Sequence, residues 1–515
     1  MLATIHTAAV NGLDAMHVYL EVSSSRGDAV VMVGLPDNAV RESRARVTSA
    51  LYNSGYHLGL SNTTINFAPA NVRKEGSGYD LPLALGLMAV DGLLPDVPWE
   101  QSLFVGELGL DGSLRPVRGM LSVAILARSM GYRSLVVPKE NAREAAVVNR
   151  LQVYGASHLN EVVDFVKGGS LLQPVEVDTR AEFAAGCTEA YPDFSDVKGQ
   201  ENVKRAFEVA AAGGHNILLV GSPGCGKSMM AKRLPSILPD FTLGESLETT
   251  KIHSVAGKLG SEVSLLHHRP FRSPHHTISD VALIGGGGSL QPGEISLAHN
   301  GVLFLDELPE FSRNALETMR QPLEDRKIII SRAKYTATLP ASFMLVAAMN
   351  PCPCGYYNHP SHPCACSPGQ IQRYMNKISG PLLDRIDIQV EVTPVPVREL
   401  AEMQPGEPSA AIRERVTRAR SVQQQRYEKA AGIYCNAQMT DRMMQEYCAL
   451  DEASSRLLRS AMDRFDLSAR AYSRILKVAR TIADLAGSEH VQSHHIAEAI
   501  GYRNLDRGDW AERGI

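Results

Sequence analysis

The sequence predicts an α/β protein with a helical C-terminal part, and three observations support this fold class. Short runs of β-branched residues alternate with helical stretches of small residues through the first third of the chain. A buried strand, a glycine-rich loop and a helix follow one another between Asn216 and the residues after Lys227. From Ser409 onward the apolar period is almost entirely helical. We therefore expect an α/β domain at 1–168, a linker at 169–192, an α/β core at 193–396 and a helical domain at 397–515.

Each predicted element follows from its local pattern. In the first domain, β-branched and aromatic runs predict strands at 29–33, 63–67, 103–105 and 135–137. Helical periodicity there predicts helices at 38–52, 81–90 and 120–130. In the second domain we expect a helix at 202–212 and buried strands at 216–220, 301–305 and 343–347. The helices of the third domain should be interrupted at Gly432, at Leu467 and Ser468, and at Gly487 and Ser488.

The composition is that of a globular protein with near-neutral charge. Of 515 residues, 44% are hydrophobic and 21% charged, which supports buried cores and excludes a long disordered or fibrous chain. The 52 Lys and Arg are offset by 56 Asp and Glu, so the net charge of −4 gives no overall attraction to phosphate. A DNA partner must therefore contact local basic segments, of which Arg413–Lys429 is one.

Two features of the sequence predict a cytoplasmic protein without a membrane partner. The first residues lack a basic segment followed by an apolar core, as a signal peptide has. The longest apolar stretch, Leu81–Val90, is interrupted by Pro82 and is too short to span a bilayer. In this compartment the 8 cysteines are expected to be thiols or metal ligands rather than disulfides.

A phosphate-binding motif follows the strand at 216–220. It fits the pattern GxxxxGK[ST] and lies between a buried strand and a helix, where such a loop binds the phosphates of a nucleotide. We expect Lys227 to reach the β and γ oxygens and Ser228 to bind Mg²⁺. The residues of the loop are Gly221, Ser222, Pro223, Gly224, Cys225, Gly226, Lys227 and Ser228.

Two carboxylates, Asp306 and Glu307, end the strand at 301–305. Alone, such a pair is usually a solvated turn, but together with the phosphate loop it predicts hydrolysis rather than binding alone. We expect Asp306 to hold Mg²⁺ through water, and Glu307 to orient and deprotonate the attacking water. Asn350, after the next buried strand, is either a simple strand cap or a contact to that water or the γ-phosphate. Arg385, after a short helix, either forms a surface salt bridge to Asp384 or Asp387 or is part of the site.

These motifs together resemble those of the AAA+ ATPases. The loop at 221–228, Leu305–Glu307, Asn350 and Leu382–Arg385 are similar to the magnesium-chelatase-like branch. Further segments are similar to the ComM/YifB family within that branch, namely Ser273–Thr277, Pro292–Glu307 and Gly380–Asp387. The resemblance covers essentially the whole chain and implies a homo-oligomeric, hexameric ring with ATP and Mg²⁺ bound between subunits.

The resemblance also implies roles for particular residues. Arg385 is expected to act as an arginine finger on the ATP of the neighbouring subunit, where it stabilises transition-state charge. Arg470 resembles the sensor 2 arginine that reaches the γ-phosphate from the helical lid. The segment Asp196–Gln200 resembles the one that packs on the adenine. The stretch before the strand at 301–305, which includes His275 and His276, resembles a helix-2 insert. A predicted hairpin, with Lys327–Ile330 and Tyr335–Thr338 as its strands, resembles the pre-sensor-1 hairpin that contacts DNA, and Arg332 and Lys334 lie at its tip.

Four cysteines lie close together in the sequence: Cys352, Cys354, Cys364 and Cys366. Four thiolates can surround Zn²⁺ tetrahedrally, and such a site is structural because it leaves no open position. His359 and His362 are alternative ligands, and exposed reduced thiols are the alternative without metal. We expect a structural zinc site within 352–366.

Two segments of the first domain, Val105–Gly119 and Val136–Asn141, resemble the proteolytic domain of Lon and imply its ribosomal S5 domain 2-like fold. The matching places the catalytic serine at Gly78 and the catalytic lysine at Leu121, so both groups of the dyad are absent. Without an activated nucleophile no acyl-enzyme forms. We interpret this domain as a scaffold for ring assembly or DNA contact rather than as a protease.

The combined prediction is an ATP-driven DNA motor that acts on single-stranded and branched DNA. The ComM resemblance implies a branch-migration helicase that helps to integrate imported DNA by homologous recombination during natural transformation. One alternative is a remodeller of the magnesium-chelatase type that acts on a protein or a cofactor. Another is a nucleotide-switched assembly factor with little turnover, against which the presence of Glu307 and Arg385 argues.

Overall fold

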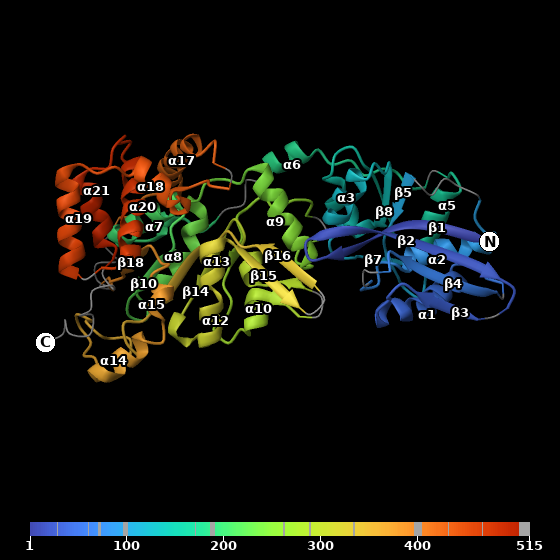
Figure 1. The fold of residues 1–515 in the computed structure, drawn as a ribbon, viewed down its shortest axis with the longest axis horizontal. Coiled ribbons are helices and arrows are strands. Elements are labelled where there is room, and N and C mark those ends of the chain that lie inside the picture. Colours follow the sequence, from blue (N-terminus) through green and yellow to red (C-terminus); the bar gives the residue numbers. More distant parts are fainter. Residues whose placement is uncertain are drawn as a thin grey trace.

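The computed structural model of the protein shows an elongated molecule (Figure 1), with the first domain at one end and the C-terminal helices at the other. Between them lies a domain with a parallel sheet. The structure describes residues 1–27, 29–59, 61–70, 74–95, 101–169, 171–185, 191–260, 263–287, 290–332, 335–395, 404–430, 432–465 and 467–503.

The first domain contains a four-stranded sheet in the order β1-β2-β4-β3. Its strands are β1 (Leu2–Asn11), β2 (Asp14–Ser25), β3 (Val30–Val33) and β4 (Asn62–Ala68), and only β3 runs parallel to its neighbour. Two helices, α1 (Asn38–Asn53) and α2 (Asp80–Val90), bury their apolar residues in the same core. The β1–β2 hairpin turns at Gly12 and Leu13, between the paired residues Asn11 and Asp14, and Gly12 has a φ of 60°. A glycine with positive φ suits the tight two-residue turns of β-hairpins.

A second, parallel sheet of the same domain has the order β5-β8-β9. Its elements are β5 (Ser102–Phe104), β8 (Ser134–Pro138), β9 (Gln152–Ala156), α3 (Met120–Ser129), α4 (Lys139–Ala146) and α5 (Leu159–Val166), with a small ribbon of β6 (Glu107–Leu108) and β7 (Leu114–Arg115). The segment predicted as a linker contains a helix, α6 (Thr179–Ala185). Val175, Val177 and Phe183 pack against the core of this sheet, so the first domain's packing extends beyond residue 168.

The central domain has a five-stranded parallel sheet in the order β11-β14-β17-β10-β18. The strands are β10 (Ile217–Val220), β11 (Phe271–Arg272), β14 (Val302–Leu305), β17 (Met344–Met349) and β18 (Ile388–Glu391). Every residue of β10, β14 and β17 is buried, as the continuous apolar runs predict for strands covered on both faces. In a parallel sheet all carboxyl ends lie at one edge, and the loops that leave this edge carry the predicted site residues.

Helices and two hairpins surround this sheet. The helices are α7 (Glu201–Gly213), α8 (Lys227–Arg233), α9 (Leu243–Val255), α10 (Asp280–Ile284), α11 (Glu294–Leu297), α12 (Arg313–Thr318), α13 (Arg320–Asp325), α14 (Pro368–Met375) and α15 (Gly380–Leu383). The hairpins are β12 (Gly285–Gly286) with β13 (Gln291–Pro292), and β15 (Lys327–Arg332) with β16 (Tyr335–Pro340). The hairpin predicted from Lys327 to Thr338 is therefore confirmed as the antiparallel pair of β15 and β16.

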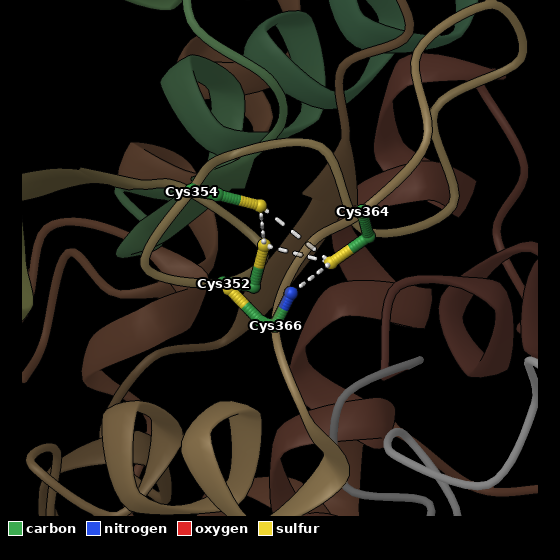
Figure 2. A group of neighbouring side chains, drawn as sticks. All are labelled: Cys352, Cys354, Cys364 and Cys366. Atoms are coloured by element: carbon green, nitrogen blue, oxygen red, sulfur yellow. Dashed lines mark hydrogen bonds between the residues drawn. The ribbon is translucent and has the colours of Figure 1, made fainter.

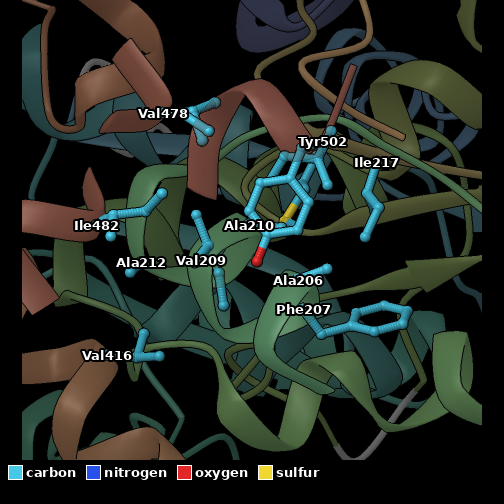
Figure 3. Packing of buried hydrophobic residues seen from close by; sticks show 14 of the residues in the cluster. Ala206, Phe207, Val209, Ala210, Ala212, Ile217, Val416, Val478, Ile482 and Tyr502 are labelled. Atoms are coloured by element: carbon cyan, nitrogen blue, oxygen red, sulfur yellow. The ribbon is translucent and has the colours of Figure 1, made fainter. Parts of the chain in front are cut away.

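The C-terminal part is helical, as predicted. It contains α17 (Ser409–Arg426), α18 (Asp441–Tyr447), α19 (Glu452–Phe465), α20 (Ala469–Leu485) and α21 (Ser493–Gly501), which end or begin near the expected breaks. Figure 3 shows that these helices share a core with α7 of the central domain, where Val416, Val478 and Ile482 lie near Val209 and Ala212. No helix of the described residues has the length and apolar character that a membrane span requires.

Candidate functional site

The loop at 221–228 connects the end of β10 to the start of α8 at Lys227. Gly224 and Gly226 have φ angles of 78° and 95°, a region that side chains with a Cβ rarely enter. A Cβ at Gly221 would lie 2.4 Å from the carbonyl oxygen of Val392, so the backbones pack too closely for any larger residue. The conformation of the phosphate loop therefore requires glycine at these three positions.

Lys227 connects the phosphate loop to the neighbouring strand. Its side chain is buried, and its Nζ donates to the carbonyl oxygens of Gly221 and Ser222 at 2.6 and 3.0 Å. The same Nζ donates to Oδ1 of Asn350 at 3.2 Å. Since Asn350 follows β17, and β17 pairs with β10, the parallel pairing brings these two polar groups to the same edge.

Ser228 and Asp306 meet at this edge as well. The Ser228 hydroxyl donates to Oδ2 of Asp306 at 2.6 Å, while Oδ1 of Asp306 accepts the backbone N–H of Glu307 at 3.0 Å. A hydroxyl and a carboxylate are the oxygen ligands that Mg²⁺ prefers beside phosphates. The structure therefore brings the two predicted magnesium ligands into direct contact.

Glu307 has a different environment from Asp306. Its backbone is left-handed, with φ 52° and ψ 48°, and its side chain is 56% exposed. Oε2 lies 3.4 Å from Nδ1 of His276, which follows β11. Sequence reasoning placed His276 only within the insert and missed this contact. The parallel pairing of β11 with β14 would have been the signal, but a two-residue strand has no periodicity to reveal it.

Arg385 and Arg470 lie at the opposite edge of the sheet. Arg385 precedes β18, whose first residue pairs with the first residue of β10. Arg470 lies at the start of α20, 3.4 Å from Oδ2 of Asp384. Four strand residues at about 3.3 Å each separate this edge from the phosphate loop. The structure thus groups the two arginines with each other and not with Lys227.

Arg385 is largely buried beside α13. Its guanidinium donates to the carbonyl oxygen of Pro381 at 2.7 Å and forms an ion pair with Glu324. Sequence reasoning had considered Asp384 or Asp387 as its surface partners, and the structure pairs it with Glu324 instead. Glu324 is 62% exposed, so the pair lies at the molecular surface.

A buried polar cluster joins this edge to the helical domain. Asp387 accepts the backbone N–H of Asn216 at 3.1 Å and pairs with Arg474 of α20 at 2.9 Å. Burial raises the pKa of Asp387, but Arg474 and His215 outweigh it and hold that pKa below its ordinary value. His215 also contacts the Thr481 hydroxyl at 2.8 Å, so β10, β18 and α20 are held by one network.

The segment 196–200 lies beside the phosphate loop. Gln200 immediately precedes α7, and its side-chain amide donates to the carbonyl oxygen of Thr393. Val392, next to Thr393, packs against Gly221. The structure therefore places this segment near the loop, where the resemblance expects the adenine.

The four cysteines converge, as the zinc prediction requires (Figure 2). Their sulfur atoms all lie within 4.8 Å of one another, and those of Cys352, Cys354 and Cys364 are 3.3 to 3.7 Å apart. Burial raises the pKa of Cys354, but backbone N–H groups of Tyr356 and Ala365 oppose it and lower that pKa to about 6. Among the described residues the converging group contains neither His359 nor His362, and Nδ1 of His359 accepts backbone N–H groups of Ser361 and His362.

The predicted DNA-contacting residues are described only in part. The backbones of β15 and β16 pair from Lys327 and Pro340 to Arg332 and Tyr335. The Arg332 side chain and the whole of Lys334 lie outside the described residues. Their contact with DNA remains a prediction.

The first domain has neither group of the Lon dyad at the matched positions. Gly78 lies in a cavity of about 350 Å³ between the first and central domains, and Leu121 is fully buried in α3. The neighbouring Ser77 hydroxyl donates to Glu107, and no lysine lines the cavity among the described residues. The described lining of this cavity therefore offers Ser77 no amine base.

The phosphate loop, two carboxylates and a parallel sheet define a P-loop protein of the α/β class. The family model described as "Magnesium chelatase, subunit ChlI" matches residues 193–400. The models described as "Subunit ChlI of Mg-chelatase" and "Magnesium chelatase, subunit ChlI C-terminal" match residues 20–141 and 406–503.

Two bacterial proteins match the chain over 98% of its length. The Haemophilus influenzae protein named "Competence protein ComM" is 43% identical over 511 residues, which cover 98% of each chain. A Salmonella typhimurium protein named "Uncharacterized protein YifB" is 43% identical with the same coverage. "Lon protease 2" of Bacillus subtilis is 28% identical over 180 residues, or 30% of this chain and 32% of the relative. The chain belongs to the ComM/YifB family of magnesium-chelatase-like AAA+ proteins.

Proposed function

We propose that the protein hydrolyses ATP with Mg²⁺ at the carboxyl edge of the central sheet. The observation that supports this most is the direct contact of Ser228 with Asp306, beside the contact of Lys227 with Asn350. In this proposal Lys227 binds the β and γ oxygens, while Ser228 and Asp306 hold Mg²⁺. The metal would offset phosphate charge, and the remaining steps belong to protein groups.

We assign the positioning and activation of the attacking water to Glu307 and Asn350. Glu307 has an exposed carboxylate beside Asp306 and is suited to orient the water and accept its proton. Asn350 offers an amide at the same edge, which can hydrogen-bond the water or the γ-phosphate. The remaining loop residues, Gly221 to Gly226, would surround the phosphates with backbone N–H groups.

We propose that the active form is a homo-oligomeric ring, a hexamer by the family resemblance. The position of Arg385 and Arg470 supports an oligomer, because both lie at the sheet edge opposite the phosphate loop of their own chain. In a ring with head-to-tail contacts, one subunit's arginines face the next subunit's nucleotide. Arg385 would act there as the arginine finger, and Arg470 would act as sensor 2 from the same edge.

We infer that the ring is a cytoplasmic DNA motor acting on single-stranded and branched DNA. The relative named for competence supports a role in the uptake or integration of DNA, which branch migration during natural transformation would supply. The β15–β16 hairpin, with Arg332 and Lys334 at its tip, is the proposed DNA contact. The first domain, with its Lon-like segments and no dyad at the matched positions, would serve as a scaffold.

The second candidate function is a remodeller of the magnesium-chelatase type. The descriptions of the three matching family models favour it, because they name a chelatase subunit. Such a protein would couple ATP hydrolysis to a protein or cofactor rather than to DNA. The two candidates differ in what stimulates hydrolysis.

The cysteine cluster is proposed to hold one structural Zn²⁺ per chain. The convergence of four sulfur atoms supports it, since four thiolates fill a tetrahedral site. Metal analysis of protein purified without chelator tests this directly. A content well below one zinc per chain would contradict it.

The ATPase and DNA proposals are tested together by hydrolysis and strand displacement. We expect single-stranded or branched DNA to stimulate ATP hydrolysis and the protein to displace a labelled strand. Lys227→Ala should lose nucleotide binding and hydrolysis, whereas Glu307→Gln should bind ATP and not hydrolyse it. Equal hydrolysis with and without DNA, together with no strand displacement, would reject the motor and favour the remodeller.

A further inference from the structure

The cysteine cluster lies directly beside the proposed ATP site. Asn350 ends β17, and Cys352 follows it by two residues. Cys352 is fully buried, and the other three cysteines are half-buried. The segment from Pro351 to Ser367, here called the cysteine loop, therefore leaves the sheet at the same edge as the phosphate loop.

The spacing of the sulfur atoms fits a metal. A Zn–S distance of about 2.3 Å in a tetrahedron places neighbouring sulfurs about 3.8 Å apart. The observed separations of 3.3, 3.6 and 3.7 Å lie close to this value. The backbone N–H of Cys366 points at the sulfur of Cys364 at 3.4 Å, and such N–H groups support thiolates that ligate zinc.

The cysteine loop also contacts the phosphate loop. Gly355 turns with a φ of 84°, and a Cβ at this position would lie 2.5 Å from Cδ of Pro223. The same point lies 3.9 Å from Cγ of Asn350. Gly355 is therefore packed against the phosphate loop, one residue after a cysteine of the cluster.

Asn350 is held from the other end of the loop too. Tyr374 of α14, which follows the cysteine loop, hydrogen-bonds the backbone of Asn350. Oδ1 of Asn350 in turn accepts a hydrogen bond from the Lys227 ammonium at 3.2 Å. Asn350, which contacts Lys227, thus immediately precedes the cysteine loop and is held by the helix that follows it, while Gly355 of the loop packs on Pro223.

We propose that Zn²⁺ bound by Cys352, Cys354, Cys364 and Cys366 clamps the cysteine loop against the phosphate loop, so that efficient ATP turnover depends on the bound metal. This inference rests on the proposed ATPase and on the proposed zinc site. The metal takes no part in the chemistry, because its four ligands leave no open position. Without it, a loop of this length has no other covalent or metal constraint on its shape.

The test compares matched cysteine variants of the full-length protein. Cys364→Ser removes a ligand far in sequence from Asn350, and Cys448→Ser removes a buried thiol outside the cluster as the control. We expect Cys364→Ser to lose zinc and to lower kcat/KM for ATP about tenfold, with weaker binding of a fluorescent ATP analogue. Cys448→Ser should keep its zinc and its kcat/KM.

A double-mutant cycle separates the clamp from general damage. Pro223→Ala removes the ring that Gly355 contacts but leaves the four thiols, so it should retain zinc and lower kcat/KM. If the metal acts through this contact, the double variant Pro223→Ala and Cys364→Ser should lose about tenfold, not about a hundredfold. Additive losses would overturn the proposed route.

A zinc-selective chelator provides a second measurement on the unmodified protein, should Cys364→Ser fail to fold. With Mg²⁺ in excess, removal of zinc should lower kcat/KM, and added zinc should restore it. A protein that loses its zinc but hydrolyses ATP at the original rate would overturn the clamp and leave the ATPase intact. A protein without zinc, or without hydrolysis, would instead reject one of the two proposals on which the clamp rests.

Discussion

At the scale of single residues, Glu307 has an unusual backbone for a residue with a side chain. A left-handed conformation costs a residue with a Cβ of order 1 kcal/mol, and such strain gathers at functional sites. It gives the second of two adjacent carboxylates an exposed position, while Asp306 bonds to Ser228. Two neighbouring acids are thereby suited to two different tasks.

His17 makes the stability of the first domain dependent on pH. Burial, followed by the proximity of His6, lowers its pKa from 6.5 to about 4, and the Tyr132 hydroxyl contacts it at 2.7 Å. Between these two values the unfolded chain binds a proton that the folded chain does not, so stability must fall as the pH falls. We expect the wild type to lose more thermal stability than His17→Gln between pH 7 and pH 4.5.

Thermal unfolding of both proteins at the two pH values measures this difference. Glutamine at position 17 binds no proton in the folded or the unfolded state. The difference between the two proteins therefore cancels the contribution of all other titrating groups. Equal losses in Tm for the two proteins would contradict the lowered pKa of His17.

Single residues also mark the limit of what the sequence could predict at the site. The phosphate loop was predictable because its residues are contiguous and its strand and helix context is local. The cluster of His215, Asp387 and Arg474 was not, because its members come from three distant segments. They meet only through the pairing of β10 with β18 and the packing of α20.

At the scale of elements, α9 connects two domains and begins with a well-formed cap. Thr242 accepts the N–H of Glu245, and the Glu245 carboxylate accepts the N–H of Thr242. Further along the helix, Lys251 pairs with Asp14 and Ser254 hydrogen-bonds Glu144 in the first domain. Loss of the cap should therefore weaken more than one local turn.

We expect Thr242→Ala to lower the free energy of unfolding by about 1 kcal/mol. Thr242→Ser keeps the hydroxyl and should stay within a few tenths of the wild type. Chemical denaturation followed by circular dichroism measures both. An unchanged midpoint for Thr242→Ala would show that the cap carries none of this stability.

The elements that were predicted well are those with long, regular patterns. The strands β10, β14 and β17 are continuous apolar runs, and α2 is an apolar stretch long enough for a helix that is buried on all sides. The helices α1 and α3 bury one face. The two-residue strands β11, β12 and β13 have no period to detect. The long hairpin of β1 and β2 was missed although Gly12 in its two-residue turn signals it, and α6 lies in the segment expected to be a linker.

At the scale of the whole molecule, the proposed ring predicts that two inactive variants rescue each other. The variant Lys227→Ala keeps Arg385 at the sheet edge opposite the phosphate loop, and the variant Arg385→Ala keeps an intact phosphate loop. Mixed at equal amounts before assembly, they should regain about a quarter of wild-type hydrolysis, because about one interface in four then combines both intact edges.

The control mixes Lys227→Ala with the double variant Lys227→Ala and Arg385→Ala. No interface in that mixture has a working phosphate loop, so hydrolysis should stay absent. If the first mixture is as inactive as its components while the variants still assemble together, the arginine does not act across the interface.

The turn between β1 and β2 reaches out of the first domain. A Cβ at Gly12 would lie 3.4 Å from Cβ of Ala337 in β16, and Leu13 packs against the core beneath the β15–β16 hairpin. From this point the two strands run to the far end of the molecule (Figure 1). Ten residues of β1 span about 34 Å, so the pair of strands reaches from the β15–β16 hairpin to the outer end of the first domain. A change of about 5° in the direction of these strands at the hairpin would displace that outer end by about 3 Å.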